Sequence, residues 1–359
     1  MLQVWGYDPS GTSWETNANC IPVIYRKYAE GANTTQVPYA FFISGYFGRY
    51  RDQNTDYVNW LDTVNIPDMI KTDIINKKCV VVVDDTSESF SYQEIKNTLT
   101  NFAERNQLTS ENFIFSTSNI NFPDHNLFDT YSDYFTLEYC SHSMIDKDID
   151  FVTEINNTRG NNWEYKFVCL QGEPRIHRID MYNLLREKFT KQEAIVTLNP
   201  GYRIKHDIPF NSEFSPYDKN VNSSTFIWHL INPYHFTKVP VAVVSETFVD
   251  SSQFNITEKT FKNLIYPQPF VLWGVPNTIK HLRKLGFDVY DRYVDHSYDS
   301  IEDYTERKNA VIDSLEKLLH TTHFPDEQEI VLHNRNIAKN LKVSQKFIEY
   351  VKTKIKNLS

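Results

Sequence analysis

The chain has 359 residues, enough for about two domains of ordinary size. Hydrophobic residues make up 40% of it and aromatic residues 14%, a composition that excludes a disordered or fibrous protein. The formal net charge is −9, which argues against a large basic surface that binds phosphates non-specifically but is compatible with a local basic pocket.

The four cysteines are not spaced as zinc ligands or as a redox dithiol; they are Cys20, Cys79, Cys140 and Cys169. Cys79 and Cys169 lie in apolar segments, so we predict that both are buried free thiols, which fits a reducing compartment. The N-terminal residues do not resemble a signal peptide, and no apolar run approaches the length of a membrane span. We therefore expect a soluble, cytoplasmic protein.

Short apolar segments alternate with amphipathic ones in the first part of the chain, a pattern typical of α/β proteins. Ile95, Leu99 and Phe102, for example, have the spacing of one helix face. The elements predicted here are strands at 1–5, 39–44, 79–83 and 112–116 and a helix at 92–105. A polar stretch at 146–162 then marks a domain boundary.

A second series of α/β elements follows this boundary. The predicted strands are 166–170, 194–198, 239–244 and 270–273, and the predicted helices are 175–188, 258–265, 278–285, 301–319 and one or two within 328–357. Gly286 is the expected C-cap of the third helix, and 199–224 is a long polar loop. We predict two Rossmann-like domains facing across a cleft: residues 1–155 and 163–325, followed by C-terminal helices at 326–359.

The most informative segment begins at Glu246, just after the predicted strand 239–244, where ligands of α/β sheets bind. Thr257 is a suitable N-cap, which places Glu258 and Lys259 in the first turn of a helix. The free amide groups and positive partial charge of a helix N-terminus suit a diphosphate. Gly274, after the next strand, lets the backbone approach a ligand. The alternative is a helix cap with a solvated charge pair.

Residues 244–291 resemble the donor-binding motif of the α1,3-fucosyltransferases. That family has a Phe-Glu-Asn segment, a helix that starts Thr-Glu-Lys, and an apolar strand that ends in glycine; here Ser245-Glu246-Thr247 replaces the first, and Thr257-Glu258-Lys259 matches the second. The resemblance implies the fold called GT-B, with Glu258 and Lys259 holding the ribose and diphosphate of a nucleotide sugar. The absent asparagine leaves the sugar open. The segment is also similar to phage-encoded glycosyltransferase-like proteins.

A second group of candidate residues opens the helix predicted at 175–188. Arg175, His177 and Arg178 follow a strand of the same domain, and arginine side chains suit phosphate oxygens. The resemblance implies an arginine for phosphate binding early in this domain, which leaves Arg175 and Arg178 as alternatives. These side chains are otherwise solvated cations of the first helical turn.

The candidates for a general base are Asp84, Asp85 and Glu88, which follow the apolar strand at 79–83. An inverting sugar transfer needs a carboxylate to take the proton of the attacking hydroxyl. The alternative for these residues is a solvated turn. His and Asp residues show no metal-ligand spacing, so we expect no metal or other cofactor, with the nucleotide sugar as co-substrate.

The sequence thus favours a glycosyltransferase that is inverting and metal-independent. Its acceptor would be a glycan or a hydroxylated base of phage DNA; the basic residues available for DNA in the first domain are Arg49, Arg51, Lys71, Lys77 and Lys78. The competing hypothesis is a non-catalytic binding or structural protein that retains the fold.

Overall fold

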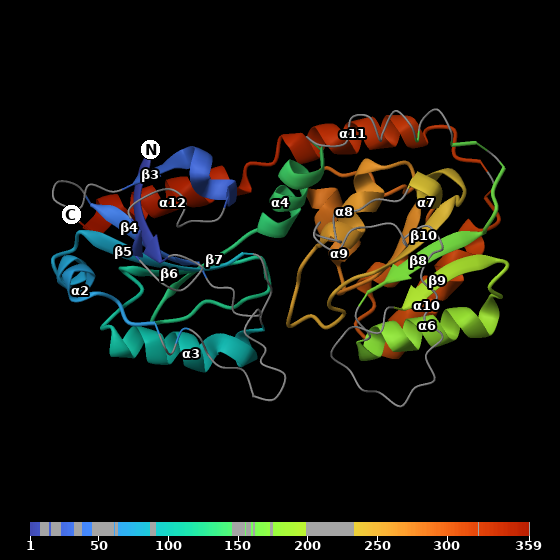
Figure 1. Cartoon of the computed structure of the whole chain (residues 1–359). Coiled ribbons are helices and arrows are strands. Elements are labelled where there is room, and N and C mark those ends of the chain that lie inside the picture. The colour runs from blue at the N-terminus through green and yellow to red at the C-terminus, as the bar shows by residue number, and fades with distance from the viewer. Residues whose placement is uncertain are drawn as a thin grey trace. The chain divides into compact units, whose positions relative to one another are not determined.

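The computed structural model describes residues 1–7, 14–15, 23–31, 38–44, 61, 64–86, 91–145, 155, 159–160, 162–172, 175–198, 233–321 and 323–358. The chain forms two compact units (Figure 1). The first contains Met1–Tyr139, Ser252–Asn255 and Leu341–Ser359, and the second contains Cys140–Ser251 and Ile256–Asn340. Each unit has its own, mainly parallel sheet with helices packed on it, as predicted for an α/β protein with Rossmann-like strand order.

These units differ from the predicted domains at their edges. The chain leaves the first unit between Tyr139 and Cys140, before the predicted boundary at 146–162. The two C-terminal helices also belong to different units: α11 (Glu327–Lys339) packs on the second, whereas α12 (Val343–Leu358) covers the sheet of the first. The physical reason is the apolar face of α12, which is buried against that sheet. The predicted loop at 199–224 lies outside the described residues.

The sheet of the first unit has the strand order β2-β1-β4-β5-β6-β7, with β3 also paired to β1. The strands are β1 (Leu2–Tyr7), β2 (Trp14–Glu15), β3 (Ala29–Gly31), β4 (Tyr39–Ser44), β5 (Cys79–Asp85), β6 (Phe113–Thr117) and β7 (Asp129–Ser132). All pairs are parallel except β1 with β2. Between β4 and β5 the register runs from Tyr39 opposite Cys79 to Ser44 opposite Asp84.

The strand order determines how the two faces of this sheet are covered. Helices α2 (Asp68–Ile75) and α3 (Tyr92–Arg105) connect successive strands in one direction, and right-handed crossovers therefore place both on the same face. Val81 and Val83 face these helices, whereas Val80 and Val82 face the other way. That second face is covered by the 3-10 helix η2 (Val23–Tyr28), the start of α4 (Phe135–Met144) and α12 (Figure 1).

Local sequence signals fix several helix ends. Ser91 and Glu94 form a capping box at the start of α3: the Glu94 amide donates to Ser91 Oγ at 3.3 Å, and the Ser91 amide donates to Glu94 Oε2 at 2.7 Å. Helix α9 (Thr278–Lys284) has Leu285 as its C-cap, one residue before the predicted Gly286. Gly286 follows with a φ of 94°, in the left-handed region that favours glycine after a helix.

The sheet of the second unit has the strand order β11-β10-β8-β9, with all pairs parallel. The strands are β8 (Phe167–Gln171), β9 (Ala194–Leu198), β10 (Val241–Ser245) and β11 (Phe270–Trp273). The chain runs from β8 outward to β9 and then returns to the other side of β8 for β10 and β11. The point between β8 and β10 is thus a topological switch point, where open α/β sheets bind ligands.

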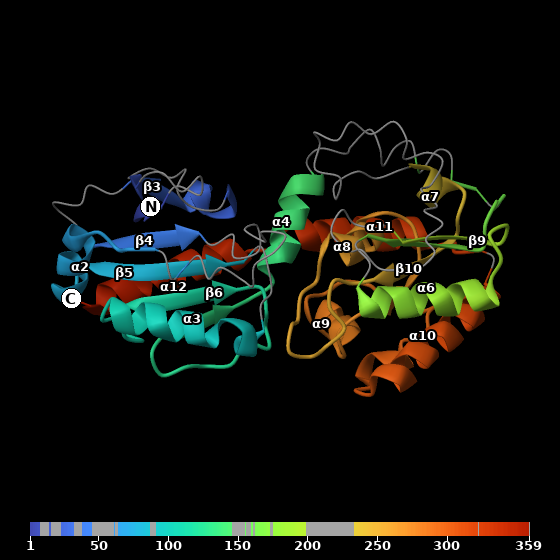
Figure 2. The ribbon, with the colours of Figure 1, turned by 60° about the horizontal axis from the view of Figure 1, so that its bottom comes forward.

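The change of direction places the connecting helices on opposite faces. The second unit contains α6 (Ile176–Lys188), α7 (Pro233–Thr237), α8 (Glu258–Ile265), α9, η6 (Ser297–Ser300), α10 (Tyr304–Leu318) and α11. Helices α6 and α10 lie on one face of the sheet, whereas α7, α8 and α11 lie on the other (Figures 1 and 2). No helix in the described part of the chain is long and apolar enough to cross a membrane.

Three cysteines lie within the described residues, and Cys79, Cys140 and Cys169 are all buried and free. The prediction of buried thiols at Cys79 and Cys169 is therefore confirmed. Burial raises the pKa of all three thiols, that of Cys169 to about 12. They are structural core residues rather than reactive thiolates.

Candidate functional site

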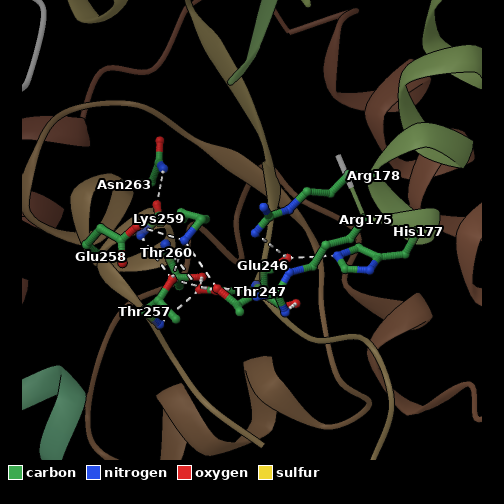
Figure 3. Close-up of polar contacts among 10 residues, drawn as sticks. All are labelled: Arg175, His177, Arg178, Glu246, Thr247, Thr257, Glu258, Lys259, Thr260 and Asn263. Atoms are coloured by element: carbon green, nitrogen blue, oxygen red, sulfur yellow. Dashed lines mark hydrogen bonds and ion pairs between the residues drawn. The ribbon is translucent and has the colours of Figure 1, made fainter. Parts of the chain in front are cut away.

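The switch point of the second sheet brings together the two groups of residues that the sequence singled out (Figure 3). Arg175, His177 and Arg178 stand at the start of α6, after β8, and Glu246 directly follows β10. These segments meet because β8 and β10 are neighbours and parallel, so that their carboxyl ends lie at the same edge of the sheet.

Two side chains of α6 donate to the main-chain carbonyl of Glu246. Arg178 Nη2 lies 3.3 Å from this oxygen, and His177 Nε2 lies 3.1 Å from it. Because a carbonyl can only accept, the His177 proton is on Nε2. Burial, with the nearby Arg178 and Arg175 charges, lowers the pKa of His177 to about 4, although the contact with Glu246 opposes the shift. His177 is thus a neutral donor at pH 7.

Thr247 contacts two cations that come from different elements. Arg175 Nη1 donates to the Thr247 carbonyl at 3.0 Å, and Lys259 Nζ donates to the Thr247 hydroxyl at 3.2 Å. The Arg175 guanidinium also lies over the Phe248 ring, 5.1 Å from its centroid. Together with Arg178, these contacts gather three positive charges around the two residues that follow β10.

The carboxylate of Glu246 is almost fully buried, with 1% of the residue exposed, and it accepts hydrogen bonds from the start of α8. Its donors are the Thr247 amide (3.0 Å), the Thr257 amide (3.0 Å) and hydroxyl (2.6 Å), and the Thr260 amide (3.3 Å) and hydroxyl (2.5 Å). The sequence assigned these helix amides to a diphosphate. In the structure Glu246 is the anion at this helix N-terminus, and it positions α8 against β10.

Thr257 is the N-cap of α8, as predicted, and its hydroxyl accepts from the Lys259 amide at 3.4 Å. Lys259 Nζ lies 2.7 Å from Glu258 Oε1 and 3.3 Å from the Thr257 hydroxyl. Burial works against the charged form of Glu258, but Lys259 and Lys262 outweigh it and lower its pKa. Glu258 is therefore ionised at neutral pH.

Gly274 follows β11, but its nearest neighbour is the side chain of Glu246. A Cβ at this position would meet Glu246 Cβ and Cγ at 3.6 Å, which is ordinary van der Waals contact. The glycine therefore gives no independent sign of a ligand. The hydroxyl groups of Thr247 and Thr260 complete the contacts of Lys259 and Glu246, which the sequence did not indicate. A hydroxyl residue three positions after an N-cap, as Thr260 is, is too common to be a signal.

Two of the candidate bases, Asp84 and Asp85, are the last residues of β5 in the first unit. Asp84 accepts from the hydroxyls of Tyr25 (3.0 Å), Ser116 (2.9 Å) and Thr86 (3.1 Å), and it faces away from α3. Asp85 has no exposed surface, and Thr117 Oγ1 lies 3.4 Å from its Oδ2. Glu88 lies outside the described residues. A role as base stays a prediction for all three.

The stability of the protein is expected to depend on the protonation of Asp84. Burial raises its pKa from 3.8 to about 6, although its hydrogen bonds oppose the shift. The folded state therefore holds this proton more tightly than the unfolded state. The resulting stabilisation is complete below about pH 4 and is lost as the pH rises through about 6, a change of about 3 kcal/mol.

Urea unfolding between pH 4 and pH 7 measures this effect. Asp84→Asn removes the titrating group, so the difference in unfolding free energy between wild type and variant should change across this range. A difference that is constant with pH would show that the pKa of Asp84 is not raised.

Within the described residues, no group of three or more His, Cys, Asp or Glu side chains is arranged to hold a metal ion. Metal independence stays a prediction.

No protein-family model matches the chain, and no curated protein matches it in sequence. Two crystal structures of an α1,3-fucosyltransferase are similar to it, one with GDP-fucose and one with GDP. Their sequence identities to the chain are 9% and 10%, and both TM-scores are 0.32. The alignments span 87% and 86% of this chain and 93% of each fucosyltransferase chain. A likeness of this size does not by itself establish a shared fold or activity.

Proposed function

We propose that the second unit binds the diphosphate of a nucleotide sugar and that the chain is a glycosyltransferase of the GT-B type. The observation that carries this proposal is the convergence of Arg175, Arg178 and Lys259 on Glu246 and Thr247, at the switch point of the sheet. Three cations from two elements at a ligand-binding edge suit a group that carries two or more negative charges.

The chemistry of sugar transfer explains why the cations stand here. When the bond between the sugar and the diphosphate breaks, negative charge develops on the leaving diphosphate, and fixed positive charges stabilise it. The side chains of Arg175, Arg178 and Lys259 supply this charge without a metal. The resemblance of residues 244–291 to the fucosyltransferase donor motif favours a nucleotide sugar over other diphosphates.

The rest of the reaction is proposed from the same resemblance. Glu258 binds the ribose, and a carboxylate of the first unit takes the proton of the acceptor hydroxyl, with inversion at the anomeric carbon. Asp85 and Glu88 are preferred as this base over Asp84, because the Asp84 carboxylate is held by three hydroxyl groups. The acceptor is a glycan or a hydroxylated DNA base.

Binding of nucleoside diphosphates tests the proposal directly. GDP, UDP, ADP and dTDP are titrated calorimetrically into wild type, into Lys259→Ala and into Lys284→Ala. Loss of the Lys259 ammonium should weaken binding of the preferred diphosphate by about 1.5–3 kcal/mol, roughly 10- to 150-fold, since it removes a charged hydrogen bond. Lys284 is an exposed lysine of the same unit, so its variant controls for the change in net charge.

The proposal is wrong if none of the four diphosphates binds, or if Lys259→Ala and Lys284→Ala bind equally well. A second measurement separates a transferase from a binding protein. Nucleotide sugars of the preferred base are incubated with the protein and candidate acceptors, and released diphosphate is followed. Binding without release for every acceptor would favour the non-catalytic alternative.

A further inference from the structure

Two neutral polar side chains are buried at the switch point without a hydrogen-bond partner among the described residues. Gln171, the last residue of β8, is 3% exposed, and Ser245, the last residue of β10, is 1% exposed. Neither Nε2 nor Oε1 of Gln171 has a partner, and Oγ of Ser245 has none.

The sheet places these two side chains next to each other. The pairing of β10 with β8 sets Val241 opposite Phe167, and continuing the same register sets Ser245 opposite Gln171. The two side chains then point to the same face of the sheet. On β11, Trp273 pairs with Ser245, and its indole Nε1 donates to the His177 carbonyl at 3.4 Å. The shared face is therefore the one covered by α6.

The same face carries the Arg178 guanidinium. Its Nη2 contacts the carbonyl of Glu246, the residue after β10, and its Nη1 lies 3.9 Å from where a Cβ on Gly172, the residue after β8, would be. Arg178 therefore spans the ends of the same two strands that end in Gln171 and Ser245. A ligand phosphate bound to Arg178 would place the neighbouring part of that ligand beside the amide and the hydroxyl.

Burial without a partner is costly, so these residues need an explanation. A buried polar group without a hydrogen-bond partner destabilises the folded protein, and an apolar side chain of similar size would avoid that cost. Gln268, another buried amide of the second unit, does have hydrogen-bond partners. It is 1% exposed, and its Nε2 donates to the carbonyls of His235 (2.7 Å) and Val239 (2.9 Å). Unsatisfied polar groups at a ligand-binding edge are typical of a site whose partner is the ligand.

We propose that Gln171 and Ser245 bind hydroxyl groups of the sugar nucleotide, either those of the ribose or those of the transferred sugar. This inference rests on the proposed function and adds the residues that recognise the neutral part of the ligand. A carboxamide has one acceptor oxygen and two donor hydrogens, and a serine hydroxyl can both donate and accept a hydrogen bond. The pair therefore complements adjacent sugar hydroxyls, which also donate and accept. Neither side chain carries a positive charge, in contrast to Arg175, Arg178 and Lys259, which are assigned to the diphosphate.

The variant Gln171→Leu separates recognition of the ligand from stability of the protein. Without ligand, the variant should be as stable as wild type or more stable, because it removes two unsatisfied atoms. Its affinity for GDP-fucose or UDP-glucose, whichever binds wild type, should fall about 10-fold, since a site built to bond a hydroxyl loses its group. Its affinity for inorganic pyrophosphate, which has no sugar hydroxyls, should be unchanged.

The corresponding nucleoside diphosphate distinguishes the two sources of hydroxyl groups. A loss of affinity for both the nucleotide sugar and the nucleoside diphosphate assigns Gln171 to the ribose. A loss for the nucleotide sugar alone assigns it to the transferred sugar. Ser245→Ala should change affinity in the same pattern, by a smaller factor.

Gln268→Leu is the matched control, because it removes an equally buried amide that has partners. It should lower the stability of the protein and leave the ratio of nucleotide-sugar to pyrophosphate affinity unchanged. The inference is overturned if Gln171→Leu behaves like this control, or if it weakens all probes equally. Failure of wild type to bind any nucleoside diphosphate or nucleotide sugar contradicts the proposed function, whereas binding that is independent of Gln171 contradicts only this inference.

Discussion

Replacing Phe347 by alanine is expected to destabilise the first unit by about 3–5 kcal/mol, the usual cost of truncating a buried phenylalanine. Phe347 comes from α12 and has no exposed surface. Its ring centroid lies 5.3 Å from that of Tyr25, 5.5 Å from that of Phe135 and 4.9 Å from that of Tyr131. The substitution therefore leaves a cavity in the middle of an aromatic cluster that joins three segments distant in sequence.

Urea unfolding of the full chain measures this loss, with Gln345→Ala as control. Gln345 lies on the exposed side of the same helix, and alanine has a high helix propensity, so the control should change stability by less than about 0.5 kcal/mol. Equal stability of the two variants would mean that α12 does not cover the sheet of the first unit.

Replacing Glu246 by alanine is the second change with a large expected effect, a loss of at least about 3 kcal/mol. The variant removes the acceptor for the buried amides of Thr257 and Thr260, and each amide left without a partner costs about 1–3 kcal/mol. It also removes the anion at the N-terminus of α8. Glu246→Gln keeps one acceptor oxygen, so its loss should be smaller.

Thermal and urea unfolding test whether Glu246→Ala lowers the stability more than Glu246→Gln does. The exposed Glu302→Gln is the control for the loss of one negative charge. If Glu246 served only to bind a ligand, as the sequence suggested, Glu246→Ala would leave the stability of the free protein unchanged. Stability equal to that of Glu302→Gln would therefore contradict the positioning role of this carboxylate.

Much of the secondary structure was predictable because local signals determine it. The predicted bounds 92–105 and 258–265 coincide with those of α3 and α8, and both helices start at a hydroxyl N-cap, Ser91 and Thr257. The predicted end of β5 was two residues short. The sequence ended this strand before Asp84 and Asp85, but Ser116 and Thr117 of β6 pair with them and supply hydroxyl groups that let both aspartates stay in the sheet.

The site was predictable in its parts but not in its connections. The sequence identified the Arg175–Arg178 and Thr257–Lys259 segments separately, because each has the residue types of a phosphate site. The two segments meet at Thr247 because the strand order brings residues 72 positions apart into contact. This order could not be predicted from either segment alone. The occupation of the helix amides by Glu246 was also hidden, since a buried carboxylate and a ligand-binding one look alike in sequence.

The position of α12 has a consequence for how the chain is made. The residues that face α12 in the first sheet, such as Phe42, Val82 and Ile114, leave the ribosome long before Val343 does. The roughly 200 residues between β7 and α12 take about 10–40 s to synthesise at 5–20 residues per second. During that time a nascent parallel sheet exposes one apolar face. Chaperone binding to ribosome-bound chains should therefore persist until α12 emerges, although the second unit is already complete.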